Sequence, residues 1–134
     1  MPRAALPLAL AAVALAGCGT GDDRAQVSAT TQRFYAALAR HDGAGACAQL
    51  SQETIKSLEQ QESKPCRIAV RELGLRPARV TRARVYITNA IVDLTGDEHA
   101  FLGREPDGWK LSAVGCRFDQ GKPRDRPADC EAES

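Results

Sequence analysis

Residues 79–116 read RVTRARVYITNAIVDLTGDEHAFLGREPDGWKLSAVGC. Ala83, Val85 and Ile87 alternate with Arg, Tyr and Thr side chains, and this two-residue period predicts a strand from about Arg79 onward. Three more strands are expected at 90–94, 98–105 and 109–116, with turns at Thr95-Gly96-Asp97 and Pro106-Asp107-Gly108. Because short turns join successive strands antiparallel, the stretch predicts a meander of about four strands.

The residues before this meander have a helical period instead. An apolar stripe predicts a first helix of about four turns that ends near Arg40, with Gly43 as the stop; it is formed by Val27, Thr31, Phe34, Tyr35 and Leu38. Shorter helices are expected at 44–50, at 52–61 behind an N-cap at Ser51, and at 66–73 with Gly74 as the C-terminal cap. Helices followed by an antiparallel sheet predict one α+β domain over residues 25–116, with the helices on one sheet face.

The N-terminus has the layout of a signal peptide. Residues 4–16 carry no charge and follow Arg3, and they are too few to span a bilayer. Leu15-Ala16-Gly17-Cys18 matches the lipobox of bacterial lipoproteins. We therefore expect residues 1–17 to be a lipoprotein signal peptide, Cys18 to carry the lipid, and residues 18–24 to be a flexible tether. The domain would then be anchored at the extracytoplasmic face of the cell membrane.

Ordinary secretion is the competing interpretation, because Ala14-Leu15-Ala16 also fits the small-residue pattern of a common signal peptidase. The chain has five cysteines, and lipidation of Cys18 leaves an even set, whereas ordinary secretion leaves one odd thiol. We expect sequential disulfides, one between Cys47 and Cys66 and one between Cys116 and Cys130. The second would pin residues 117–134, a tail without periodicity. These spacings contain no C-x-x-C redox motif and no closely spaced zinc pairs.

The net charge and the two histidines bear on which partners and cofactors are expected. Without Arg3, seventeen Lys and Arg balance seventeen Asp and Glu, so a nucleic-acid partner is not expected. His41 and His99 form no metal motif, and we expect no metal or cofactor. One arginine series could contact anionic lipid, but we expect it to be a solvated helix face followed by a charged edge strand; it comprises Arg67, Arg71, Arg76, Arg79, Arg82 and Arg84.

Several short segments carry a family resemblance. Phe34-Tyr35-Ala36-Ala37-Leu38, the following Asp42-Gly43-Ala44, the helix bearing Cys47, and Gly108-Trp109-Lys110-Leu111 running into Gly115-Cys116 resemble small actinobacterial lipoproteins of the nuclear transport factor 2-like superfamily. The resemblance spans about Val27 to Cys130. It implies a curved sheet wrapped around the first helix as a cone with a pocket. That superfamily includes ketosteroid isomerase and SnoaL-like polyketide cyclases, and also members with no known activity.

The catalytic pairs of those enzymes, Tyr with Asp or His with Asp, match no position of this chain. The candidates for lining a pocket are Tyr35, Tyr86, Asp93 and Trp109. Asp93 in an apolar cone would be a general acid or base, but we expect it to face water opposite Val92 and Leu94. We likewise expect an exposed His99, and Tyr35 and Tyr86 in the core with bonded hydroxyls.

The sequence therefore assigns no catalytic residue. It favours a lipid-anchored, non-enzymatic domain of the cell envelope that binds a small apolar ligand or an envelope protein. Two alternatives stay open: a pocket enzyme of the cyclase or isomerase type, and a structural accessory subunit without a ligand.

Overall fold

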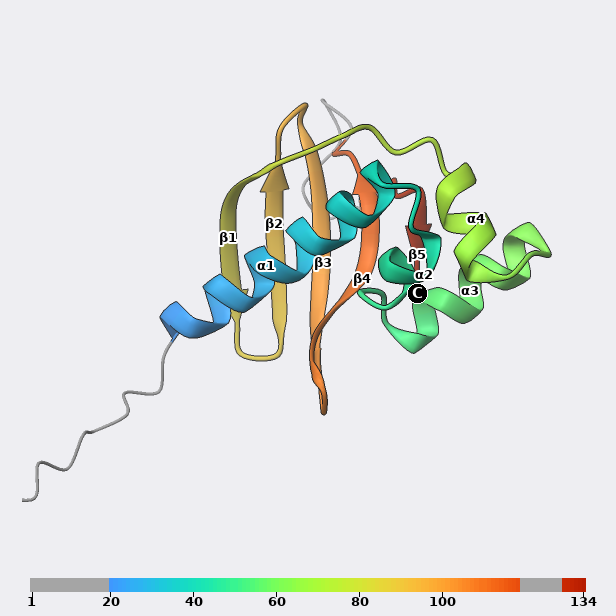
Figure 1. Cartoon of the computed structure of the whole chain (residues 1–134). Coiled ribbons are helices and arrows are strands. Elements are labelled where there is room, and N and C mark those ends of the chain that lie inside the picture. The colour runs from blue at the N-terminus through green and yellow to red at the C-terminus, as the bar shows by residue number, and fades with distance from the viewer. Residues whose placement is uncertain (1–19, 119–128) are drawn as a thin grey trace, which may run out of the picture.

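The computed structural model describes residues 20–118 and 129–134. Within these ranges four helices precede five strands (Figure 1): α1 Thr20–Ala39, α2 Gly43–Cys47, α3 Gln52–Glu62, α4 Cys66–Glu72, β1 Val80–Tyr86, β2 Asn89–Leu94, β3 Glu98–Glu105, β4 Gly108–Cys116 and β5 Ala132–Glu133. The α+β class and the four predicted strands of the meander are confirmed. The expected signal peptide and the lipid site at Cys18 lie outside the described residues.

The five strands form one open antiparallel sheet in the order β1-β2-β3-β4-β5. The predicted count of about four strands is one too few, because β5 pairs Ala132 with Val114 at the outer edge of β4. Strand β1 is the opposite edge of the sheet, as expected for the arginine series. Arg82 of β1 and Arg79 just before it are exposed, and such charges discourage pairing with another chain at this edge.

Helix α1 lies across one face of the sheet, and the three shorter helices gather beside β4 and β5 (Figure 1). Helix α1 begins at Thr20, so the expectation of a flexible tether is wrong for residues 20–24. Two features explain this early start. Asp22 and Asp23 lie in the first turn, where carboxylates favour the positive end of the helix dipole, and Asp23 also accepts a hydrogen bond from Trp109 Nε1 at 3.2 Å.

The core fills the space between α1 and the sheet. Phe34 of α1, Val92 of β2 and Leu111 of β4 are fully buried there. Within a strand, the side chains that alternate with these core residues point to the opposite face of the sheet. The outer edge of β4 is closed before β5 begins: Leu111 N donates to Gln49 O, and Ser51 N donates to Leu111 O, each at 2.8 Å. No helix in the described part of the chain has the length and apolar character needed to cross a membrane.

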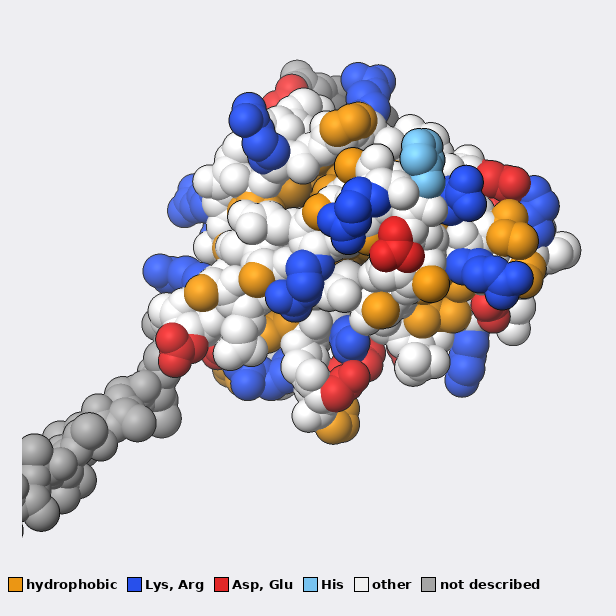
Figure 2. All heavy atoms as spheres, viewed as in Figure 1, with side chains coloured by type: hydrophobic (Ala, Val, Ile, Leu, Met, Phe, Trp, Pro, Cys, Tyr) orange, Lys and Arg blue, Asp and Glu red, His pale blue; other side chains and the backbone are white. Residues whose placement is uncertain are grey.

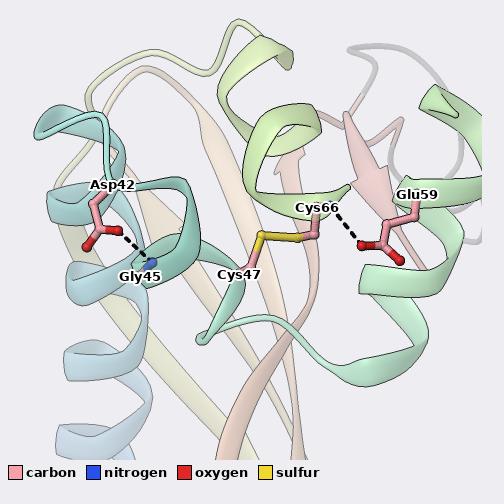
Figure 3. The surroundings of a disulfide bond; sticks show 5 residues. All are labelled: Asp42, Gly45, Cys47, Glu59 and Cys66. Carbon is pink, nitrogen blue, oxygen red and sulfur yellow. Dashed lines mark hydrogen bonds between the residues drawn. A yellow bond between two sulfur atoms is a disulfide. The ribbon is translucent and has the colours of Figure 1, made fainter. Parts of the chain in front are cut away.

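Three short helices are tied together around the Cys47–Cys66 disulfide, which confirms one predicted pair (Figure 3). Asp42 caps α2 by accepting from Gly45 N at 2.9 Å. The first turn of α4 is capped from another helix, because Glu59 Oε1 accepts from Cys66 N at 2.8 Å. Gly43 was expected to stop the first helix, but it begins α2. The disulfide joins α2 to α4 and the Glu59 carboxylate joins α3 to α4, so the three helices form one cluster.

The turn between β1 and β2 is strained at Ile87. Its φ is 46°, a left-handed conformation that costs a β-branched residue roughly 1–2 kcal/mol. Its side chain is 90 % exposed, so no packing offsets this cost. We expect Ile87→Gly to raise the free energy of unfolding by about 1 kcal/mol in urea denaturation, since glycine adopts this φ freely. An unchanged or lower stability would contradict the assigned turn geometry.

Candidate functional site

The sheet face opposite the helices carries an open groove of about 410 Å³. Its floor comes from successive strands, where Ile91 of β2 pairs with Phe101 of β3, and Phe101 pairs with Ala113 of β4. Tyr86 lines the groove from β1, and the C-terminal segment borders it through Cys130, Glu133 and Ser134. Residues far apart in sequence thus build one mainly apolar depression.

The C-terminal border of this groove is held by covalent and backbone bonds. The Cys116–Cys130 disulfide joins the end of β4 to the segment before β5, and it confirms the second predicted pair. Arg117 and Asp129 exchange backbone hydrogen bonds, and Ser134 N donates to Ser112 O at 3.1 Å. The shape of the groove therefore depends on this disulfide and on the pairing of β5.

A polar network lies beside the apolar floor on the same sheet face. Asp93 Oδ1 accepts from Arg84 Nη2 at 2.6 Å and lies 2.9 Å from His99 Nδ1. The Phe118 ring packs on the His99 ring with centroids 4.6 Å apart, and it also contacts Phe101. The positive charge of the Arg84 guanidinium compensates the negative charge of the Asp93 carboxylate. These contacts hold the side chains of Arg84, Asp93 and His99 in place beside the groove. An imidazole beside a carboxylate can also take part in proton transfer.

The structure separates the four residues predicted to line a pocket. Asp93 does lie on the face opposite Val92 and Leu94, but its side chain is only 24 % exposed. Tyr86 lines the groove with 54 % of its surface exposed, so the expectation of a core position is wrong. Tyr35 and Trp109 are buried on the helix-covered face. His99 is also less exposed than expected, with 21 % of its side chain accessible.

Tyr35 is in the core as predicted, but its hydroxyl makes no well-formed hydrogen bond in the described structure, and the Gly115 backbone amide is the polar group that contacts it. Glu98 is buried nearby; its Oε1 accepts from Arg117 Nη2 at 2.9 Å, while its Oε2 is also without a partner. Burial, and then the charge of Glu98, raise the pKa of the Tyr35 phenol well above its usual value, although the Gly115 amide offsets a part. The phenol therefore stays protonated in the folded chain.

We expect Tyr35→Phe to leave the stability unchanged or to raise it by up to about 1 kcal/mol, because it removes a buried hydroxyl that makes no well-formed hydrogen bond. The pH dependence should change as well. Above about pH 10 the unfolded chain ionises Tyr35 and the folded chain does not, so wild-type stability falls as the pH rises. In urea titrations at pH 9 and 11, the free energy of unfolding of the phenylalanine variant should fall less between the two pH values than that of the wild type. Equal slopes in both proteins, or a destabilised variant, would contradict the assignment.

A second depression, of about 400 Å³, lies where α1 meets the β3–β4 turn. Both of its basic side chains already have partners: Arg33 Nε donates to Gln49 Oε1 at 3.2 Å, and Lys110 Nζ donates to Ala48 O at 2.9 Å. Within residues 20–118 and 129–134, no three His, Cys, Asp or Glu side chains gather as a metal site. The groove is therefore the stronger candidate.

Reasoning from single strands missed the floor residues Ile91, Phe101 and Ala113. The sequence does show that these apolar residues alternate with the core residues of their strands. It does not show that they lie side by side, because that depends on the register between the strands. No known protein family matches the chain, and neither the curated proteins nor the solved structures contain a match. A function for this chain has to be argued from its own geometry.

Proposed function

We propose that this chain is a lipid-anchored domain of the cell envelope whose groove binds a small apolar ligand. The observation that carries this proposal is the apolar row formed by Ile91, Phe101 and Ala113 across three strands. A volume of about 410 Å³ falls within the range of small-molecule sites. An elongated chain, such as an alkyl or acyl group, fits a shallow groove of this kind.

The proposed location rests on two independent features. The two disulfides indicate an oxidising, extracytoplasmic environment. The sequence Leu15-Ala16-Gly17-Cys18 supports lipidation at Cys18. Mass spectrometry of protein taken from host membranes should find a mature chain that begins at Cys18 with added lipid mass. An unmodified cysteine would contradict the anchor.

A relation to the nuclear transport factor 2-like superfamily is part of the proposal, supported by a long first helix across an antiparallel sheet. The binding site we propose differs from a pocket inside a cone. Phe34, Val92 and Leu111 fill the space under α1, whereas the groove lies on the other sheet face.

Ala113→Phe tests the proposed groove by filling its floor. We expect the affinity for dodecanoic acid, measured by isothermal titration calorimetry, to fall by about tenfold, which equals roughly 1.4 kcal/mol. Arg82→Phe is the matched control, because it adds the same ring to the same sheet face outside the groove residues. Equal affinities for both variants would contradict binding in the groove. No binding by the wild type would favour a protein partner or an accessory role instead.

The Asp93–His99 contact supports a second candidate, an enzyme that uses the groove. In that case His99 would exchange a proton with a ligand bound on the neighbouring apolar floor. His99→Gln separates the two functions: an enzyme would lose its turnover with little change in ligand affinity, whereas a binding protein would show no turnover in either form.

A further inference from the structure

The β1–β2 turn presents an unusual pair of exposed side chains. Ile87 is 90 % exposed and Tyr86 is 54 % exposed. The left-handed backbone at Ile87 would suit asparagine or glycine better, so folding does not account for an isoleucine here. An apolar tip beside an amphipathic tyrosine is the composition of a membrane-interface contact.

The start of α1 lies at the same end of the sheet as this turn. In a meander, the β1–β2 and β3–β4 turns share one end, and Figure 1 shows the first turn of α1 there. Specific contacts fix this placement: Asp23 accepts from Trp109 Nε1 and pairs with Arg104, both close to the β3–β4 turn. The chain that precedes Thr20 therefore joins the domain at this end.

The distance from the anchor to the domain is short. Cys18 precedes Thr20 by only two residues, and two extended residues span at most about 7 Å. With a lipid on Cys18, the bilayer surface has to lie close to the first turn of α1. The end of the sheet that carries Tyr86 and Ile87 then faces the membrane.

The charges at this end favour an apolar contact over attraction to anionic headgroups. Arg104 is paired with Asp23, and Lys110 lies 3.4 Å from Asp107. Basic and acidic side chains are also interspersed over the helix-covered face (Figure 2). With no uncompensated basic cluster in these contacts, binding should depend little on the lipid charge.

We propose that the Tyr86–Ile87 tip inserts into the interface of the bilayer that holds the lipid anchor. Ile87 enters the boundary between headgroups and acyl chains, and the Tyr86 ring lies at headgroup level. This inference rests on the proposed lipidation of Cys18. Because Tyr86 also lines the groove, the contact places one end of the proposed ligand site at the lipid surface.

The test uses the full lipidated protein in phosphatidylcholine vesicles, with a nitroxide on Thr88→Cys beside the tip. The reference label is on Asp97→Cys, in the exposed β2–β3 turn at the opposite end of the sheet. We expect the label at residue 88 to be several-fold less accessible to aqueous nickel chelate than the label at residue 97, and more accessible to oxygen. Ile87→Asn should abolish this difference without unfolding the domain, because asparagine tolerates the left-handed turn.

Three outcomes would overturn the inference. Equal chelate accessibility at residues 88 and 97 in vesicle-bound protein would leave the anchor intact and reject insertion of the tip. A label at residue 88 that is shielded from both oxygen and chelate would assign the tip to a protein contact. If the protein carries no lipid on Cys18 and does not float with the vesicles, the proposed anchor is wrong, and the proposed insertion of the tip is wrong with it.

Discussion

Replacing Cys116 and Cys130 together by serine should lower the free energy of unfolding by about 3 kcal/mol, because the disulfide closes a loop with a separation of 14 residues. The effect should extend to the groove. Cys130 borders the groove, and Arg117, next to Cys116, pairs with the buried Glu98 carboxylate. Without the disulfide, the segment that carries β5 keeps its backbone bonds to β4 and Arg117 and the packing of Ala132 in the core, but it loses its covalent link to the end of β4. We therefore expect dodecanoic acid binding to weaken as well.

The other disulfide provides the matched control. Replacing Cys47 and Cys66 by serine opens a loop with a separation of 19 residues, so a similar loss of about 3 kcal/mol is expected. That disulfide joins α2 to α4, away from the groove residues, and binding should stay intact. Urea denaturation and calorimetry on both double variants check this contrast. Equal effects on binding would show that the groove does not depend on the C-terminal disulfide.

Gly43→Ala should destabilise the protein by about 3 kcal/mol, as an overpacked contact between two backbones. A Cβ atom at residue 43 would lie 1.9 Å from the Arg67 carbonyl oxygen and 2.7 Å from its carbon. Because both are backbone atoms, α2 and α4 would have to move apart while the disulfide still joins them. Thermal and urea denaturation measure the loss.

Gly21→Ala is the control for this substitution. It is also a helical glycine, but a Cβ there would meet no atom within 4 Å. Its stability should be unchanged or slightly higher, since alanine favours helices. A Gly43→Ala protein as stable as this control would contradict the close approach of α2 to α4.

Periodicity was enough to predict most of the fold. The stripe that includes Val27, Thr31 and Phe34 marked the buried side of α1, and the alternation from residue 79 onward predicted the meander. The sequential disulfides followed from the cysteine positions. These features could be predicted because each depends on spacing within one segment or on a simple count.

Other features depend on contacts between distant segments. The Ala132–Glu133 strand is too short to show a period, and it forms because Cys130 holds the segment beside β4. The polar, glycine-containing residues before Arg24 predict a flexible tether, because the sequence does not show that Asp23 accepts a hydrogen bond from the distant Trp109. Tyr86 was expected in the core because it is aromatic, although it shares its strand face with Arg82 and Arg84, and the structure places it on the groove face. The groove was missed for the same reason, since its floor exists only once three strands are in register.

The most direct test of the proposed groove is a titration of the isotope-labelled, disulfide-bonded chain with dodecanoic acid, followed by amide NMR shifts. Our account predicts saturable shifts concentrated at the floor residues Ile91, Phe101 and Ala113 and at neighbouring Tyr86. It would be contradicted by an absence of shifts, or by shifts centred on the helix-covered core around Phe34 and Leu111.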